Sequence, residues 1–251
     1  MKQKCYIVNA DDCGLSTTVN EHIKKSIEAG RVTSTTVMAN MHDLEGAVAL
    51  YRQYGDSVSF GWHINLTEGR PILKSQVLLD AGYYVEKDGE VEFNGRAFWH
   101  KRISALMKSE IKKELIAQCS MIRDSGIVIS HADGHHHIHT SPSMMLFIPS
   151  LLQQLGISRM RRLRNYVPNS LSYVARMAVG SFISVCYHEI RQVDTFCYFR
   201  EYVNNPNLRQ GSIVEMECHP GNPAYADEEK MLMDTDLNLI YGGKMITYTD
   251  F

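Results

Sequence analysis

The sequence predicts an α/β fold in which about seven parallel strands form a distorted (β/α) barrel within a single domain. Short apolar runs rich in β-branched residues alternate with helical patterns along the whole length. The chain has 251 residues, close to the roughly 250 that one such barrel needs. No Pro/Ser-rich linker and no internal repeat divides the chain. An open, doubly wound sheet is the alternative arrangement.

The expected strands are short runs in which apolar and β-branched residues dominate. They cover residues 5–10, 31–39, 57–66, 127–131, 159–163, 193–199, 213–218 and 244–248. The expected helices show apolar residues at helical spacing and recognisable end signals. They cover residues 17–29, 42–54, 109–125, 142–155 and 227–240. Ser16 is a suitable N-cap for the first helix and Gly30 a suitable stop, and Pro142 stands at a helix start.

One stretch interrupts this alternation. Residues 71–99 carry three glycines and mixed charges and fit neither pattern. We interpret them as an insertion that forms a hairpin or a lid near the site.

The composition excludes several classes of protein. The net charge is -2, whereas a nucleic-acid binder normally has a basic excess, and the same balance gives no reason to expect an anionic membrane partner. No apolar stretch approaches the ~20 residues of a membrane span. The six cysteines form no CxxC pair, which is typical of a reducing compartment, so we expect a cytoplasmic protein.

Polar residues follow four of the expected strands. Asp11 and Asp12 come directly after the first one, and neighbouring residues of an extended chain point to opposite sides. One carboxylate of the pair is then free to hold a metal while the other faces a substrate. A helix-capping Asp beside a solvated one is the alternative.

Histidines mark the other strand ends. His63 lies inside an apolar strand, where a histidine that only packs in the core is the common case. Five of the 11 histidines lie between His131 and His139, and if this segment stays extended, His131, Asp133, His135, His137 and His139 share one face. Imidazole and carboxylate groups are ligands for divalent transition metals. His219 closes another strand, and its ordinary pKa of ~6.5 suits a general acid.

Five motifs in order resemble the YdjC-like carbohydrate deacetylases, a family that includes chitooligosaccharide deacetylase. They are NADDCGLS at 9–16, VTSTT at 32–36, GWHINLT at 61–67, HADGHHHIH at 131–139 and ECHPG at 217–221. The resemblance spans nearly the whole chain. It implies that residues 1–251 form one (β/α)-barrel domain of deacetylase type that binds one divalent ion, Mg²⁺ or Zn²⁺. It also implies removal of acetyl groups from N-acetylglucosamine units of small oligosaccharides.

The resemblance also implies roles for individual residues. The metal ligands of the family fall on Asp12, His63 and His135, the base on Asp11 and the acid on His219. The strand arginine of the family falls on Arg161, although the segment RMRRLRN departs from the usual Arg-x-Pro pattern. We expect Arg161, His137 and Trp62 to contact the substrate. Trp62, Tyr83 and Tyr84 are candidates to stack on a sugar face, with core packing as the alternative.

The sequence is compatible with two other functions. One is a different metal-dependent barrel enzyme, such as a sugar isomerase or a phosphodiesterase, although the strand ends show few additional carboxylates. The other is a non-enzymatic, His-rich metal-binding protein, which leaves Asp11 and His219 without a role. A homodimer is common for barrels of this kind, and no partner other than a small acetylated sugar is expected.

Overall fold

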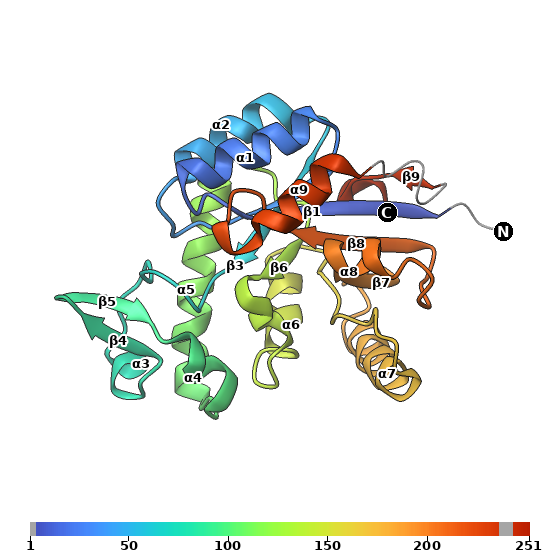
Figure 1. Cartoon of the computed structure of the whole chain (residues 1–251). Coiled ribbons are helices and arrows are strands. Elements are labelled where there is room, and N and C mark those ends of the chain that lie inside the picture. Colours follow the sequence, from blue (N-terminus) through green and yellow to red (C-terminus); the bar gives the residue numbers. More distant parts are fainter. Residues whose placement is uncertain (1–3, 236–242) are drawn as a thin grey trace.

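A computed structural model describes residues 4–235 and 243–251 and shows a parallel sheet that curls into a half-barrel (Figure 1). The strand order is β6-β3-β2-β1-β8-β7, and β9 pairs with β1. The strands are β1 (Cys5–Cys13), β2 (Ser34–Val37), β3 (Ser59–Ile64), β6 (Ala132–Gly134), β7 (Thr195–Tyr198), β8 (Ile213–Cys218) and β9 (Lys244–Met245). All pairs within this sheet are parallel. The predicted α/β fold with a distorted barrel of about seven strands is therefore confirmed.

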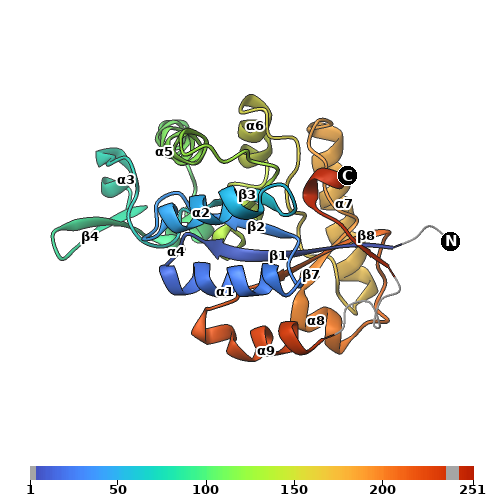
Figure 2. The same cartoon turned by 90° about the horizontal axis from the view of Figure 1, so that it is seen from above.

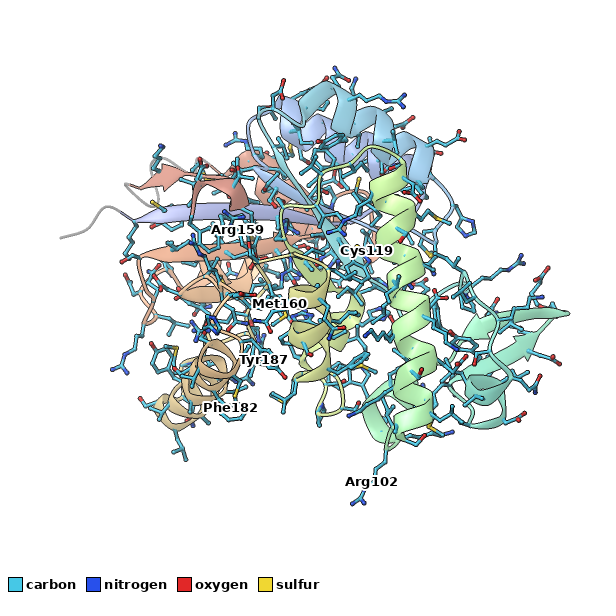
Figure 3. The ribbon with its side chains drawn as sticks, turned by 180° about the vertical axis from the view of Figure 1, so that it is seen from behind. Arg102, Cys119, Arg159, Met160, Phe182 and Tyr187 are labelled. Atoms are coloured by element: carbon cyan, nitrogen blue, oxygen red, sulfur yellow. The ribbon has the colours of Figure 1, made fainter. Side chains whose placement is uncertain are left out.

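An irregular segment lies between the two ends of this strand order. The Arg161 N–H donates to the carbonyl of Ala132 in β6 at 2.9 Å. On its other side, the Met160 N–H donates to the carbonyl of Arg191, shortly before β7, at 3.0 Å. The strand expected at 159–163 is reduced to isolated bridges at Arg159 and Met160, because the backbone pairs with both neighbours over only a few residues. Arg159 and Met160 are labelled in Figure 3, which views the molecule from the side opposite to Figure 1.

Helices surround the curled sheet, with α5, α6 and α7 on one side of the molecule and α1, α8 and α9 on the other (Figure 2). The helices are α1 (Thr17–Glu28), α2 (Leu44–Tyr54), α3 (Gln76–Asp80), α4 (Gly95–His100), α5 (Ala105–Asp124), α6 (Phe147–Gln154), α7 (Ser170–Cys186), α8 (Phe199–Asn204) and α9 (Ala226–Asp234). Ser16 caps α1 as predicted, because its hydroxyl accepts a hydrogen bond from the Val19 N–H. Within the described residues, three short 3₁₀ turns cover His135–Thr140, Pro223–Tyr225 and Tyr248–Asp250.

Several boundaries differ from the sequence prediction. The strand expected at 127–131 starts only at Ala132, and the helix expected from Pro142 starts only at Phe147. The helix expected at 227–240 is observed as Ala226–Asp234, and residues 236–240 lie outside the described part of the chain. Helix α7 was not predicted: its exposed face carries Leu171, Val174, Phe182 and Val185, so its sequence lacks the polar face of a typical surface helix.

Residues 71–99 do contain a hairpin. Strands β4 (Tyr84–Lys87) and β5 (Glu90–Phe93) form a two-stranded antiparallel sheet between α3 and α4. Figure 1 shows it projecting from one end of the molecule, beside α5. Among the described residues, no helix combines the length and the apolar character that crossing a membrane requires.

Candidate active site

The carboxyl ends of the strands surround a cavity of about 460 Å³. Six residues singled out from the sequence line it together: Asp11, Asp12, His63, His135, His137 and His219. They come from β1, β3, the turn after β6 and the end of β8, segments far apart in the sequence. This is the end of a parallel α/β fold where functional residues gather.

The two aspartates face the same cavity, contrary to the expectation that neighbours point to opposite sides. The reason is a local irregularity in β1. The register between β1 and β2 shifts between Ala10 and Cys13, and Asp12 has a positive φ of 68°. A non-glycine residue rarely adopts this conformation, so the fold stores backbone strain to bring both carboxylates into one site.

Three ligand atoms converge at the inner end of the cavity. Asp12 Oδ1 lies 3.3 Å from His63 Nε2 and 3.0 Å from His135 Nδ1, and these two nitrogens are 3.3 Å apart. The Asp12 oxygen is buried and has no hydrogen-bond partner of acceptable geometry among the described residues. Oxygen and imidazole nitrogen are suitable ligands for a divalent metal ion.

The second nitrogen of each histidine is already engaged. His63 Nδ1 lies 2.6 Å from Asp133 Oδ1, and His135 Nε2 lies 2.9 Å from Glu68 Oε2. A proton placed on each of these nitrogens leaves a lone pair on the other, directed at Asp12. Three electron-pair donors then face one another in a buried space, which is favourable only with a cation between them. The residues therefore fit a divalent metal ion.

The protonation equilibria of this cluster agree with that conclusion. Burial alone would lower the pKa of His63, but the charge of Asp133 and the contact with Asp12 outweigh it and raise that pKa well above its usual value. Burial alone would raise the pKa of Asp12, but His135 and His63 hold it well below its usual value. The site favours a positive charge between the two imidazoles and the carboxylate.

Two other groupings of possible ligands overlap this one. Asp11, His63 and Asp133 form one of them, but the Arg161 guanidinium already lies against both of its carboxylates, so the cation there is the arginine. Glu68, His135 and His136 form the other, and Glu68 and His136 are exposed. The buried group around Asp12 is the stronger candidate.

The histidine-rich segment does not stay extended, which corrects the expectation of one shared face. A 3₁₀ turn covers His135–Thr140, in which His136 and His137 take left-handed conformations with φ of 51° and 54°. His137 reaches the cavity wall, where its Nε2 lies 3.1 Å from the Tyr198 hydroxyl. His139 is buried away from the cavity. Period-two alternation requires extended backbone, and the turn ends it after Gly134.

Arg161 lies beneath the cavity and does not line it, with 0% of its surface exposed. Its guanidinium donates to both oxygens of Asp11, at 2.7 Å each. This bidentate contact outweighs the desolvation that would raise the pKa of Asp11, and the pKa lies below its usual value. Asp11 is therefore held ionised, in one orientation, at the cavity wall.

His219 lies across the cavity on the loop after β8. Its ring stacks on Tyr225 with centroids 4.2 Å apart. Its backbone N–H donates to Glu228 Oε2 at 3.1 Å, and its ring Nδ1 lies 3.4 Å from the same oxygen. Burial alone would lower its pKa, but the Glu228 contact and the charges of Asp11 and Glu217 raise the pKa to about 9. The site therefore favours the protonated form of His219.

The aromatic candidates for sugar stacking lie elsewhere. Trp62 is 0% exposed and Tyr83 and Tyr84 are 1% exposed, and none of them lines the cavity. Their side chains pack in the core. A neighbouring cavity of about 210 Å³ shares a wall with the first one, and Trp99, which is 37% exposed, lines it together with Arg164 and Arg176.

Sequence reasoning assigned no role to three carboxylates that orient site residues. Asp133 was noticed only as part of the histidine-rich motif, although its position two residues before His135 indicates the same face. Glu68 follows the GWHINLT motif directly, so its position beside the site could have been predicted from the sequence. Glu228 has no such signal, because only the fold brings α9 back to the end of β8.

Comparison with known proteins adds independent information. A family model described as "YdjC-like protein" matches residues 6–242. A "Carbohydrate deacetylase" of Geobacillus stearothermophilus is 29% identical over 98% of this chain and 97% of its own. A protein of the same description from Halalkalibacterium halodurans is 31% identical over 88% of this chain and 86% of its own. Another from Vibrio campbellii is 34% identical over 86% and 78%.

A crystal structure from Enterococcus faecalis V583 has the same fold. It carries the provisional description of a cellobiose-phosphate cleavage protein. The two chains share 20% identity with a TM-score of 0.76, and the match covers 99% of each. At this identity the likeness establishes the fold alone.

We predict that one divalent ion binds between Asp12, His63 and His135. Replacing any of the three with Ala removes one of the converging donors and should lower the affinity for Mn²⁺ or Zn²⁺ by at least about tenfold. Metal analysis after dialysis and isothermal titration would measure this. His136→Ala is the matched control and should bind nearly as the parent does. Full metal occupancy in Asp12→Ala would contradict the assignment.

Proposed function

Because the chain belongs to the family of YdjC-like proteins, we propose that it is a metal-dependent carbohydrate deacetylase. The reaction would hydrolyse the amide of N-acetylglucosamine units in small oligosaccharides, releasing acetate and a free amine. The observation that carries this proposal is the arrangement within one cavity of three converging metal donors, an ionised carboxylate and a protonated imidazole. The relatives described as carbohydrate deacetylases supply the substrate class.

The residues divide the chemistry as follows. Asp12, His63 and His135 would hold a divalent ion, Mg²⁺ or Zn²⁺, which when bound polarises a carbonyl group and makes a neighbouring water more acidic. Asp11 would accept the proton of the attacking water, because Arg161 keeps it ionised and fixes its direction. The same arginine weakens Asp11 as a base, so its contribution depends on orientation more than on basicity.

His219 would protonate the amine that leaves when the C–N bond breaks. Its Nδ1 faces Glu228, so Nε2 is the nitrogen left for the substrate. Because the elevated pKa keeps the ring charged at neutral pH, the proton is already in place when the bond breaks.

The two cavities favour a substrate of more than one sugar ring. The larger one holds the proposed catalytic residues, and the smaller one opens beside it across His136, His137 and Tyr198. Trp99 offers the smaller cavity an exposed aromatic surface that the buried Trp62 cannot offer the larger one. A second ring bound there would leave the acetylated ring at the metal site.

The other functions have less support. A sugar isomerase or a phosphodiesterase would gain from a second metal ion, but Arg161 already occupies the neighbouring group of carboxylates. A protein that only binds metal would need neither the contact that holds Asp11 against Arg161 nor the raised pKa of His219.

We predict acetate release from diacetylchitobiose by the metal-loaded protein. A coupled acetate assay across N-acetylglucosamine, its dimer and its trimer would measure it, with higher kcat/KM expected for the dimer than for the single sugar. Exhaustive chelation should abolish the release, and added metal should restore it. Release that persists without metal would refute the metal dependence. The absence of release from every N-acetyl sugar with metal bound would shift the weight to the isomerase or the metal-binding function.

Replacing Asp11 with Asn should lower kcat by ~10²–10⁴-fold, because the amide cannot accept the proton of the water. Metal content should stay at the parental level, since Asp11 is not among the proposed ligands. Asp227→Asn is the matched control: this exposed carboxylate lines the same cavity, and its loss should leave kcat within about twofold. Near-parental kcat in Asp11→Asn would show that another group is the base.

The alkaline side of the pH–rate profile should report His219. Activity requires its protonated form, so kcat/KM should fall as the pH rises through the His219 pKa, about 9 in the metal-free site. The charge of a bound divalent ion would lower that pKa. Glu228→Gln removes the carboxylate beside the ring and should move the alkaline limb to lower pH. An unmoved limb would assign it to another group.

A further inference from the structure

The last residues of the chain enter the amino-terminal side of the barrel. The Lys244 N–H donates to the Lys4 carbonyl at 2.9 Å, and the Ile246 N–H donates to the Tyr6 carbonyl at 2.8 Å, so this segment runs along β1. Figure 1 shows β9 beside the start of β1. The chain then turns inward, and Tyr248 becomes completely buried, with 0% of its surface exposed.

A first chain of contacts leads from Tyr248 to the proposed base. Its hydroxyl donates to Glu215 Oε2 at 2.5 Å. The other oxygen of Glu215 accepts from Arg161 Nε at 2.6 Å. The opposite side of the same guanidinium donates to both oxygens of Asp11. Three consecutive contacts, none longer than 2.7 Å, thus connect the end of the chain to Asp11.

A second chain of contacts uses the aromatic ring. Tyr248 stacks on His131 with centroids 3.6 Å apart and planes 8° apart. His131 Nε2 lies 3.3 Å from Asn9 Oδ1, and the Asn9 amide donates to Asp11 Oδ1 at 2.8 Å. Gly61 leaves the space that this stack needs, because a Cβ there would lie 2.5 Å from the His131 ring. Tyr248 therefore supports Asp11 from two directions.

We propose that Tyr248 is a positioning residue for Asp11, acting from the end of the chain through Glu215 and Arg161. It touches neither the cavity nor the proposed metal ligands. Its hydroxyl fixes the rotamer of Glu215, which fixes the guanidinium plane of Arg161. That plane determines where the two oxygens of Asp11 point. This inference rests on the proposed function, since it concerns the base of that reaction.

Removing the hydroxyl has a definite physical consequence. In Tyr248→Phe the ring keeps its stack on His131, but Glu215 Oε2 loses its donor in a fully buried position. An unsatisfied buried carboxylate oxygen is unfavourable, so Glu215 reorients and its contact with Arg161 weakens. The guanidinium then holds Asp11 less precisely, and small displacements of a reacting group lower the rate strongly.

The test compares steady-state kinetics of the metal-loaded parent and its variants on diacetylchitobiose. Tyr248→Phe should lower kcat about tenfold and change KM less than about twofold, because binding in the cavity is untouched. Metal content should not change. Tyr83→Phe is the matched control: this tyrosine is also buried, and its hydroxyl donates to the Arg102 carbonyl at 3.1 Å, in the hairpin region. It should keep the parental kcat.

A double-mutant cycle separates positioning from a general loss of stability. Glu215→Gln should also lower kcat. In the double variant, adding Tyr248→Phe should lower kcat little further, because the hydroxyl acts through that carboxylate. Additive losses, or parental kcat in Tyr248→Phe despite a lower Tm, would overturn the inference. If Tyr248→Phe does not fold, parental kcat in Glu215→Gln would overturn it equally.

Failure of the proposed function gives a different result. In that case the parent releases no acetate from any N-acetyl sugar, and the crystal structure of Tyr248→Phe becomes the test. We expect the Arg161 contacts to Glu215 and Asp11 to lengthen there. Unchanged positions of Glu215, Arg161 and Asp11 would overturn the positioning role regardless of activity.

Discussion

The candidate site depends on one buried cation. The Arg161 guanidinium is fully enclosed and lies within 2.9 Å of oxygens from Asp11, Asp133, Glu215 and Glu217. Its other face packs over the Phe196 ring, 4.8 Å from the centroid. Taking an isolated arginine out of water would cost many kcal/mol, and several short, directed contacts are what make this burial tolerable. In return, four carboxylates from β1, β6 and β8 are held in fixed positions relative to one another.

That arrangement connects the two halves of the proposed chemistry. Asp11 belongs to the reacting side of the cavity, whereas Asp133 holds the Nδ1 atom of His63 and so orients a proposed metal ligand. Because the same guanidinium contacts both carboxylates, the position of the base and the direction of the ligand are set together. Orientation of this kind, obtained before the substrate arrives, costs nothing at the moment of reaction.

The sequence predicted the fold and the gathering of the site residues well, because both depend on local patterns. Strand Ile213–Cys218 was predicted to the residue, and Asp11, Asp12, His63, His135 and His219 were expected at one end of the sheet. The prediction failed where an irregular backbone conformation determines the direction of a side chain. The positive φ of Asp12 and the left-handed pair His136 and His137 are local backbone conformations that no hydrophobic periodicity encodes. The pairing of Tyr248 with Glu215 could not be predicted either, since the two residues are 33 positions apart in the chain.

The balance of charge at the strand ends gives a further reason to expect a metal ion. Four carboxyl groups, those of Asp11, Asp133, Glu215 and Glu217, contact one arginine, and Asp12 adds a fifth carboxyl group at the same strand ends. The pKa values respond to this excess: burial and the nearby charge of Asp133 raise the pKa of Glu215 to about 7, although Arg161 opposes the shift. The raised pKa of His63 is a second response to the same field. Arg161 contacts the other four carboxylates, whereas Asp12 Oδ1 faces two imidazole nitrogens. A divalent ion at that point would supply positive charge that Arg161 does not, without displacing the arginine that holds Asp11.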